Sequence, residues 1–193
     1  MKVTDFELAR EIADFMKRLC RQQLTTALRG DISVRRGDEI FITPDGVDRG
    51  WIETDDVGRI APDGRVLDPG FKPSCGAELH LAVYRQRPDI TAIVHAYPVT
   101  ADAFSASDAE IRASAVSGKI GRISQPYSGM PVLAEAAADR AKECDVLLLK
   151  DHGAMAFGTS LLQAFDRIEV LENAAKITLI CEHLLKNGVC TLP

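Results

Sequence analysis

Residues 91–97, TAIVHAY, are a short apolar run that ends in a histidine and a tyrosine. The apolar run predicts a buried β-strand. Because side chains alternate along a strand, we expect His95 and Tyr97 on the same face of it. A second apolar run, residues 145–158 (DVLLLKDHGAMAFG), predicts a buried strand that breaks at a corner carrying His152. Ligand sites often form at strand ends in such sheets, so the two histidines favour a metal site.

The two histidines also have a second interpretation. Each could be a core histidine whose nitrogens are satisfied by hydrogen bonds. A zinc site needs a third protein ligand, and the spacing of His95 and His152 in the sequence does not identify one. His183 lies beside Glu182 in the last predicted helix, where we expect a partly exposed residue without a functional role.

The rest of the chain predicts helices and hairpins around these strands. Alternating residues on either side of a tight turn predict hairpin-like units at 32–46 and 58–68. Apolar residues at helical spacing predict four helices, at 4–21, 73–88, 131–144 and 159–187. Helices and short strands mixed along one chain predict a single α/β domain over residues 1–193, with helices packed on the faces of a mixed sheet.

The composition is that of an ordinary globular protein, with 46% hydrophobic and 26% charged residues in a chain of 193. The net charge is −5 and basic residues are scattered among acids, so a small molecule is a better partner than nucleic acid or an anionic membrane. Five cysteines without a CxxC pair favour reduced thiols. The charged start is unlike a signal peptide and no apolar run reaches membrane length, so we expect a cytoplasmic protein.

Five segments together resemble the class II aldolase and adducin head domain family, whose members include L-fuculose-phosphate aldolase. They occur in the family's order and cover nearly the whole chain: ELAREIADF, GDISVRRGDEIFITPDGVDRG, KPSCGAELHLAVYRQRPDITAIVHAY, CDVLLLKDHGAMAFG and AFDRIEVLENAAKITLI. The resemblance implies an α/β/α sandwich around a central, largely antiparallel mixed sheet. It also implies a bound divalent metal, with zinc preferred, and a homotetramer with active sites between subunits.

The resemblance implies that three turns bind the substrate, and each departs from the family's pattern by one residue. The corresponding residues are Gly30, Asp31, Thr43, Gly46, Ser74 and Cys75. Asp31 and Asp45 place carboxylates where a phosphate would bind, so the sequence favours a neutral sugar, a hydroxy-aldehyde or a ligand with an amine over a phosphorylated one. Cys75 is interpreted as a small buried residue rather than an activated thiolate or a soft metal ligand.

The resemblance assigns the metal to His95 and His152, with Tyr97 at the position of the family's other histidine. Tyr97 is therefore a candidate third ligand or proton donor, although a phenol of pKa about 10 is a poorer ligand than imidazole. Gly76 stands in place of the family's glutamate, and Glu78 is the nearest candidate catalytic base. The alternative role for Glu78 is an acid at a helix N-terminus, where the helix dipole stabilises it.

The resemblance, with these residues, implies a metal-dependent aldehyde-lyase that cleaves a sugar phosphate or a related hydroxy-aldehyde by a retro-aldol reaction. An epimerase or dehydratase acting through the same enediolate chemistry is an alternative. A second alternative is a catalytically impaired or inactive member that serves as a ligand-binding or assembly module. The replaced glutamate and histidine favour it, as does the absence of any tyrosine after Tyr127, because family aldolases use a tyrosine near the C-terminus.

Overall fold

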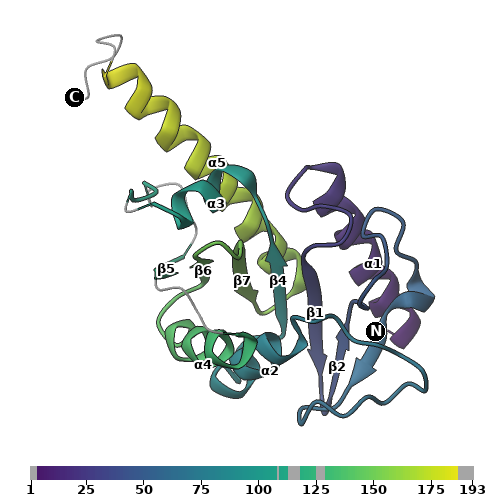
Figure 1. Cartoon of the computed structure of the whole chain (residues 1–193). Coiled ribbons are helices and arrows are strands. Elements are labelled where there is room, and N and C mark those ends of the chain that lie inside the picture. The colour runs from purple at the N-terminus through teal and green to yellow at the C-terminus, as the bar shows by residue number, and fades with distance from the viewer. Residues whose placement is uncertain (1–3, 108, 113–117, 125–128, 187–193) are drawn as a thin grey trace.

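One seven-stranded sheet forms the centre of the computed structural model, which describes residues 4–107, 109–112, 118–124 and 129–186 (Figure 1). The strand order is β3-β2-β1-β4-β7-β6-β5. β5 and β6 are parallel, and all other neighbouring strands are antiparallel. The strands are β1 (Asp31–Arg36), β2 (Glu39–Ile42), β3 (Gly58–Ile60), β4 (Ala92–Ala96), β5 (Ile120–Ile123), β6 (Val146–Leu149) and β7 (Ala154–Gly158). The prediction of a mixed, largely antiparallel sheet is confirmed.

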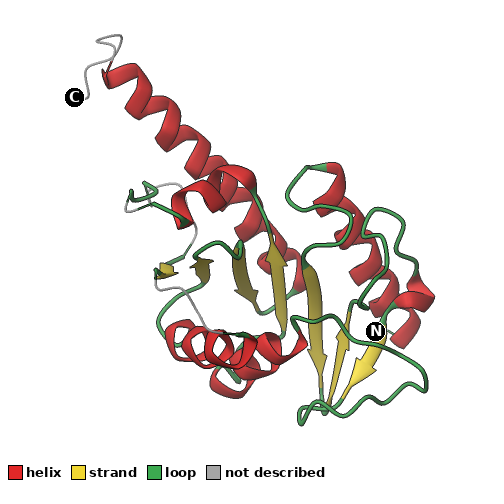
Figure 2. Ribbon diagram, in the orientation of Figure 1, coloured by secondary structure: helices red, strands yellow, loops and turns green. Residues whose placement is uncertain are grey.

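Helices cover both faces of the sheet (Figure 2). One core layer joins the sheet to α1, α3 and α5, and a second joins its other face to α2 and α4. The α/β/α sandwich is therefore confirmed. The helices are α1 (Asp5–Arg21), α2 (Ala77–Gln86), α3 (Val99–Ser105), α4 (Met130–Ala141) and α5 (Leu161–Lys186), with a 3₁₀ turn η1 at Thr54–Asp56.

The helix starts follow local capping chemistry. Thr4 and Glu7 form a capping box at the start of α1, and a proline occupies the first turn of α4. At α5 the Gln163 backbone amide donates to the Ser160 hydroxyl at 3.2 Å. The short helix α3 was not predicted. The expected end of the last helix at residue 187 lies outside the described residues, as does Tyr127.

The start of α2 differs from its prediction. Residues 73–76 precede the helix, which begins at Ala77 instead of residue 73. The Ser74 amide donates to the carbonyl of Thr43 at 3.0 Å, so this segment is bound to the chain that follows β2. Gly76, with no side chain to cap the helix, is the residue directly before it.

The corner between β6 and β7 depends on two residues with positive φ. Asp151 has φ 57° and Gly153 has φ 75°. A β-carbon at Gly153 would lie 2.2 Å from the carbonyl oxygen of Ala96, so only glycine fits there. This close approach places the loop that carries His152 against the end of β4. Among the described helices, none combines the length and apolar character that a membrane crossing requires.

Candidate functional site

Asp31 and His95 face each other across the pair formed by β1 and β4. Residues directly opposite in an antiparallel pair share a face of the sheet, so their side chains are neighbours. The distance from Oδ1 of Asp31 to Nδ1 of His95 is 3.4 Å. Both side chains lie on the face covered by α2, because Ile93, two residues before His95, packs in the core layer that contains α2.

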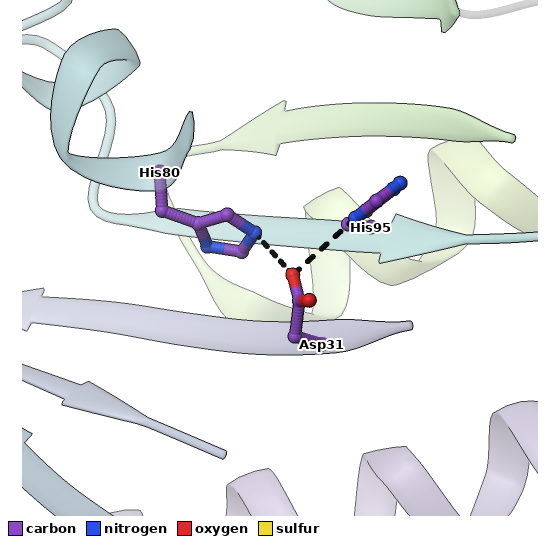
Figure 3. Close-up of side chains that lie close together, drawn as sticks. All are labelled: Asp31, His80 and His95. Carbon is purple, nitrogen blue, oxygen red and sulfur yellow. Dashed lines mark ion pairs between the residues drawn. The ribbon is translucent and has the colours of Figure 1, made fainter. Parts of the chain in front are cut away.

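His80 reaches the same carboxylate from α2. Its Nε2 lies 2.6 Å from Oδ1 of Asp31, and Figure 3 shows the aspartate between the two imidazoles. The three side chains are almost fully buried, with exposed fractions of 4% for Asp31, 0% for His80 and 2% for His95. One ligand atom from each lies within 4.8 Å of the others, so this cluster could hold a metal ion. We call Asp31, His80 and His95 the inner cluster.

The outer atoms of the inner cluster are hydrogen bonded. Oδ2 of Asp31 accepts from the Ser74 hydroxyl at 2.7 Å, and Nδ1 of His80 lies 2.7 Å from the hydroxyl of Ser33. Nε2 of His95 is 2.9 Å from the backbone carbonyl oxygen of His152. The three inner atoms contact one another: Oδ1 of Asp31 lies at ion-pair distance from Nε2 of His80 and from Nδ1 of His95.

His95, Tyr97 and His152 form a second group, which we call the outer cluster. The ring centroid of His95 lies 5.1 Å from that of Tyr97 and 5.2 Å from that of His152, and the Tyr97 and His152 centroids are 5.8 Å apart. Tyr97 and His152 are half-buried. Above the Tyr97 ring, at 4.7 Å from its centroid, lies the guanidinium carbon of the exposed Arg29. The outer cluster thus has an open side bordered by a cation.

Burial and neighbouring charges shift the pKa values of Asp31, His95 and His152 in different directions. Burial alone would raise the pKa of Asp31, but the neighbouring His80 and His95 outweigh it and hold that pKa well below its usual value. Burial would lower the pKa of His95, yet the Asp31 carboxylate raises it above the usual value. Burial, together with the charge of His95, lowers the pKa of His152 to about 4. His152 is therefore neutral at pH 7.

The three predicted substrate-binding turns lie next to one another. An isolated bridge pairs Pro44 with Pro73, which brings the 43–46 turn to the 73–75 segment. Gly30 approaches His95 closely, since a β-carbon at Gly30 would lie 2.8 Å from the His95 carbonyl oxygen. Gly46 has φ 72°, in the region that favours glycine.

Several predicted site residues have contacts that the sequence did not indicate. Thr43 is buried, and its hydroxyl accepts from the amide of Ile32 at 3.2 Å. Cys75 is exposed, so its interpretation as a small buried residue is wrong: it lies in the segment before α2, outside the core. Glu78 is exposed in the first turn of α2, where the helix dipole favours an acid. On a helix, Glu78 and His80 point to nearly opposite sides, and His80 is the one that points inward.

Asp31 and Asp45, which the sequence suggested would repel a phosphate, each have a basic neighbour in the structure. Asp45 pairs with Lys72, whose Nζ lies 2.6 Å from its Oδ2. Asp31 points at two imidazoles. The repulsion expected for an anionic substrate is therefore weaker than the sequence suggested.

The sequence reasoning missed His80. The available signal was its position four residues after Gly76, because residues i and i+4 share a face of a helix. If position 76 faces the site, as the resemblance implies, then His80, four residues later on the same helix face, faces it too.

Comparison with known proteins gives consistent matches. Residues 10–179 match the family of class II aldolase and adducin N-terminal domains. The L-fuculose phosphate aldolase of Methanocaldococcus jannaschii is 37% identical over 156 residues, covering 78% of this chain and 84% of that protein. The 3-oxo-tetronate 4-phosphate decarboxylase of Haemophilus influenzae is 33% identical, over 77% of this chain and 75% of that protein. The crystal structure of L-fuculose-1-phosphate aldolase from Thermus thermophilus superposes with TM-score 0.76 and 25% identity, over 97% of this chain and 98% of that one.

Proposed function

Because this chain belongs to the class II aldolase and adducin N-terminal domain family, we propose that it is a metal-dependent aldehyde-lyase. Its substrate would be a sugar phosphate or a related hydroxy-aldehyde, cleaved by a retro-aldol reaction. The observation that carries the proposal is the outer cluster, in which His95, Tyr97 and His152 lie together at the ends of buried strands on a half-exposed side. Relatives named as L-fuculose phosphate aldolase support this reaction class.

A divalent metal fits the donor set of this region. Imidazole nitrogens are common zinc ligands, and the ring centroids of His95 and His152 lie 5.2 Å apart. In the proposed site His95 and His152 hold the metal, with Tyr97 as third ligand or proton donor. A bound metal would act as a Lewis acid toward the hydroxyl and carbonyl oxygens of the substrate.

The remaining chemistry is proton transfer by the chain's own residues. A retro-aldol cleavage needs a group that removes the substrate hydroxyl proton and a group that returns a proton to the carbon of the second product. His152, with its pKa of about 4, is neutral at pH 7, so a ring nitrogen can serve either as a metal ligand or as a hydrogen-bond acceptor. Tyr97, beside it, carries the phenolic proton. Glu78 stays a predicted base, and its exposed position does not support that role.

The substrate-binding turns would hold the rest of the substrate. Ser74, Gly30 and the 43–46 turn adjoin the inner cluster, and Arg29 borders the outer one. An exposed guanidinium recognises phosphate or carboxylate well. Because Asp45 is paired with Lys72, this arrangement supports a phosphorylated substrate, which the sequence alone had disfavoured.

Other properties are proposed from the family resemblance. We propose zinc as the metal, a cytoplasmic location, and a homotetramer with sites between subunits. The exposed apolar residues of α5 support a subunit contact, because Ile177, Leu179 and Ile180 are 53%, 54% and 57% exposed. Gel filtration coupled to light scattering measures the molar mass of the assembly and so tests the tetramer directly.

Two specific observations keep an impaired or inactive ligand-binding module as the second candidate. Position 76 has no carboxylate, and Nε2 of His95 already lies 2.9 Å from the His152 carbonyl oxygen. An epimerase or dehydratase is the third candidate. The decarboxylase name of one relative indicates that similar chains serve another reaction.

The proposed function is tested by turnover. Zinc-loaded and manganese-loaded protein is assayed for aldehyde release from a panel of sugar phosphates and hydroxy-aldehydes, starting with L-fuculose 1-phosphate. We expect cleavage that a chelator abolishes, that His152→Ala reduces at least 100-fold, and that the exposed control His183→Ala leaves unchanged. Absence of cleavage by the metal-loaded protein across the panel would exclude the lyase and favour the binding module.

A further inference from the structure

We propose that Arg29 binds the anionic group of the substrate, a phosphate or a carboxylate, at the open side of the outer cluster. The inference rests on the proposed function and deepens it, because it names the residue that selects the substrate by its charge. It differs from the resemblance, which implies that a phosphate binds at the turns containing Thr43 and Ser74. An anion held by Arg29 lies beside Tyr97, next to the groups proposed to react.

Hydrogen bonds fix the chain around Arg29 to the end of β4. The buried Thr25 hydroxyl donates to the carbonyl oxygen of Arg29 at 2.8 Å. The Tyr97 amide donates to the carbonyl oxygen of Leu24 at 2.8 Å, so the segment that carries Arg29 is joined to the residue over which its side chain lies. The backbone therefore places the guanidinium at the outer cluster, which lowers the entropy that an ordered contact there would cost.

The guanidinium of Arg29 is available to a ligand. It is exposed, its carbon lies 4.7 Å from the centroid of the Tyr97 ring, and it forms no hydrogen bond or ion pair with the described part of the chain. Arg59, by comparison, is paired with Asp68 at 2.7 Å. Attraction to a ring face uses the positive charge of a guanidinium and consumes none of its N–H donors. Arg29 can therefore donate to an anion without giving up an existing pair.

The positive charge of Arg29 also reaches His152. Burial and the charge of His95 are the larger causes of the lowered pKa of His152, and the charge of Arg29 adds to them. Two carboxylates act on this region, and both are held by donors. Asp31 is buried between two imidazoles, and Asp102 accepts from a backbone amide of the corner between β6 and β7 at 3.1 Å.

The two hydroxyls of the turns that the resemblance assigns to a phosphate are buried and engaged. Ser74 is 3% exposed, and its hydroxyl donates to Oδ2 of Asp31 at 2.7 Å. Thr43 is 0% exposed, and its hydroxyl accepts from the amide of Ile32. A phosphate bound by Ser74 would have to break its bond to a carboxylate and then lie beside that negative charge. These turns are therefore poorly suited to the anionic group itself.

The pocket beside the 43–46 turn has an unfavourable charge for an anion. Its volume is about 460 Å³, and four aspartates, Asp45, Asp55, Asp56 and Asp68, contribute to its lining. Lys72 is the one basic residue among the described residues that line it, and it is paired with Asp45. Repulsion by these carboxylates directs an anionic group away from this pocket and toward the cation at the outer cluster.

Binding of two small anions tests the inference without turnover. The full chain is titrated at constant ionic strength with inorganic phosphate and, separately, with glycolate, and NMR follows the Nε–H signal of Arg29. We expect this signal to shift with at least one of the two anions, and Arg29→Gln to raise the Kd at least tenfold. The matched variant Lys72→Gln, which removes the exposed cation beside the 43–46 turn, should change the Kd less than twofold. Tighter binding of phosphate assigns a phosphate group to the substrate, and tighter binding of glycolate assigns a carboxylate.

Circular dichroism checks folding of each variant. If Arg29→Gln fails to fold, Arg29→Lys replaces it: that change keeps the charge but removes the planar fork, and we expect it to raise the Kd at least threefold. A wild type that binds neither anion would overturn the inference. So would a folded Arg29 variant that binds as the wild type does, or a loss of binding confined to Lys72→Gln.

Turnover separates this inference from the proposed function. For an anionic substrate that the wild type cleaves, Arg29→Gln should lower kcat/KM at least tenfold, mainly by raising KM, and should change kcat/KM for its neutral analogue less than about threefold. Cleavage with unchanged preference for the anionic substrate would refute the inference and leave the proposed function intact. Anion binding that depends on Arg29 in a protein that cleaves nothing would support the anion site and refute the lyase.

Discussion

A β-carbon at Gly76 would lie 2.5 Å from Oδ2 of Asp31 and 2.9 Å from its Oδ1. The carboxylate at 31 therefore fills the space that any side chain at 76 would need. The resemblance implies a glutamate at position 76; a glycine stands there, and the neighbouring carboxylate comes from Asp31 on β1. The two departures from the family pattern are linked by packing.

Gly76→Ala tests this packing. Because the side chain of Asp31 is buried and held by Ser74, it cannot move away freely, and we expect a loss of about 1–3 kcal/mol in the free energy of unfolding. Urea denaturation measures it. In an Asp31→Ala background the same change should cost much less, since the colliding oxygens are gone. An equal cost in both backgrounds would show that the clash is not the reason.

The pH behaviour of the two outer histidines should be opposite in the metal-free protein. His152 has its pKa lowered to about 4 by burial and by the charge of His95, whereas Asp31 raises the pKa of His95. His152 therefore favours unfolding as pH falls from the ordinary histidine value of about 6.5 toward 4, because the unfolded chain binds that proton more readily. The stability contributed by His95 is present below pH of about 6.5 and is lost as pH rises through its folded pKa.

NMR titration of the imidazole Cε1–H signals measures both values, with His152→Gln and His95→Gln for assignment. Arg29→Gln is a matched variant: its positive charge lowers the pKa of His152, so the variant should raise that pKa and leave His95 nearly unchanged. A His152 signal that titrates near the ordinary value would contradict the structure's account of its burial.

Cysteine reactivity should follow exposure. Cys75 is exposed, whereas Cys144 is buried, and burial raises the pKa of the Cys144 thiol to about 11. At pH 8 we expect iodoacetamide to alkylate Cys75 at least tenfold faster than Cys144, because the thiolate is the reactive form. Peptide mapping by mass spectrometry at timed intervals gives both rates. Fast labelling of Cys144 in the folded protein would be inconsistent with its place in the core.

Glu172 of α5 holds the start of α3, the helix that begins two residues after Tyr97. Its buried carboxylate accepts from the amides of Thr100 and Ala101 at 3.0 Å each, which joins α5 to the start of α3. Glu172→Ala leaves these amides without an acceptor, and we expect a loss of about 2–4 kcal/mol in unfolding free energy. The exposed neighbour Asn173 supplies the control, since Asn173→Ala should change stability by less than about 0.5 kcal/mol. Similar effects of the two changes would argue against this role of Glu172.

Short-range patterns in the sequence determined much of the architecture. Helical spacing located α1, α4 and the start of α5, and apolar runs located β4, β6 and β7. The order of segments identified the family and, through it, the α/β/α sandwich. The outer cluster could also be anticipated, because His95 and Tyr97 are two residues apart on one strand and His152 lies at a recognisable corner.

Tertiary structure alone decided the inner cluster. Asp31 meets His95 because of the register between β1 and β4, and register depends on how whole strands fit the core rather than on any local motif. His80 joins them because α2 begins at Ala77, after a segment bound to the chain beyond β2. The sequence placed histidines at strand ends, but only packing between distant segments could place a carboxylate between two of the imidazoles and close that cluster to solvent.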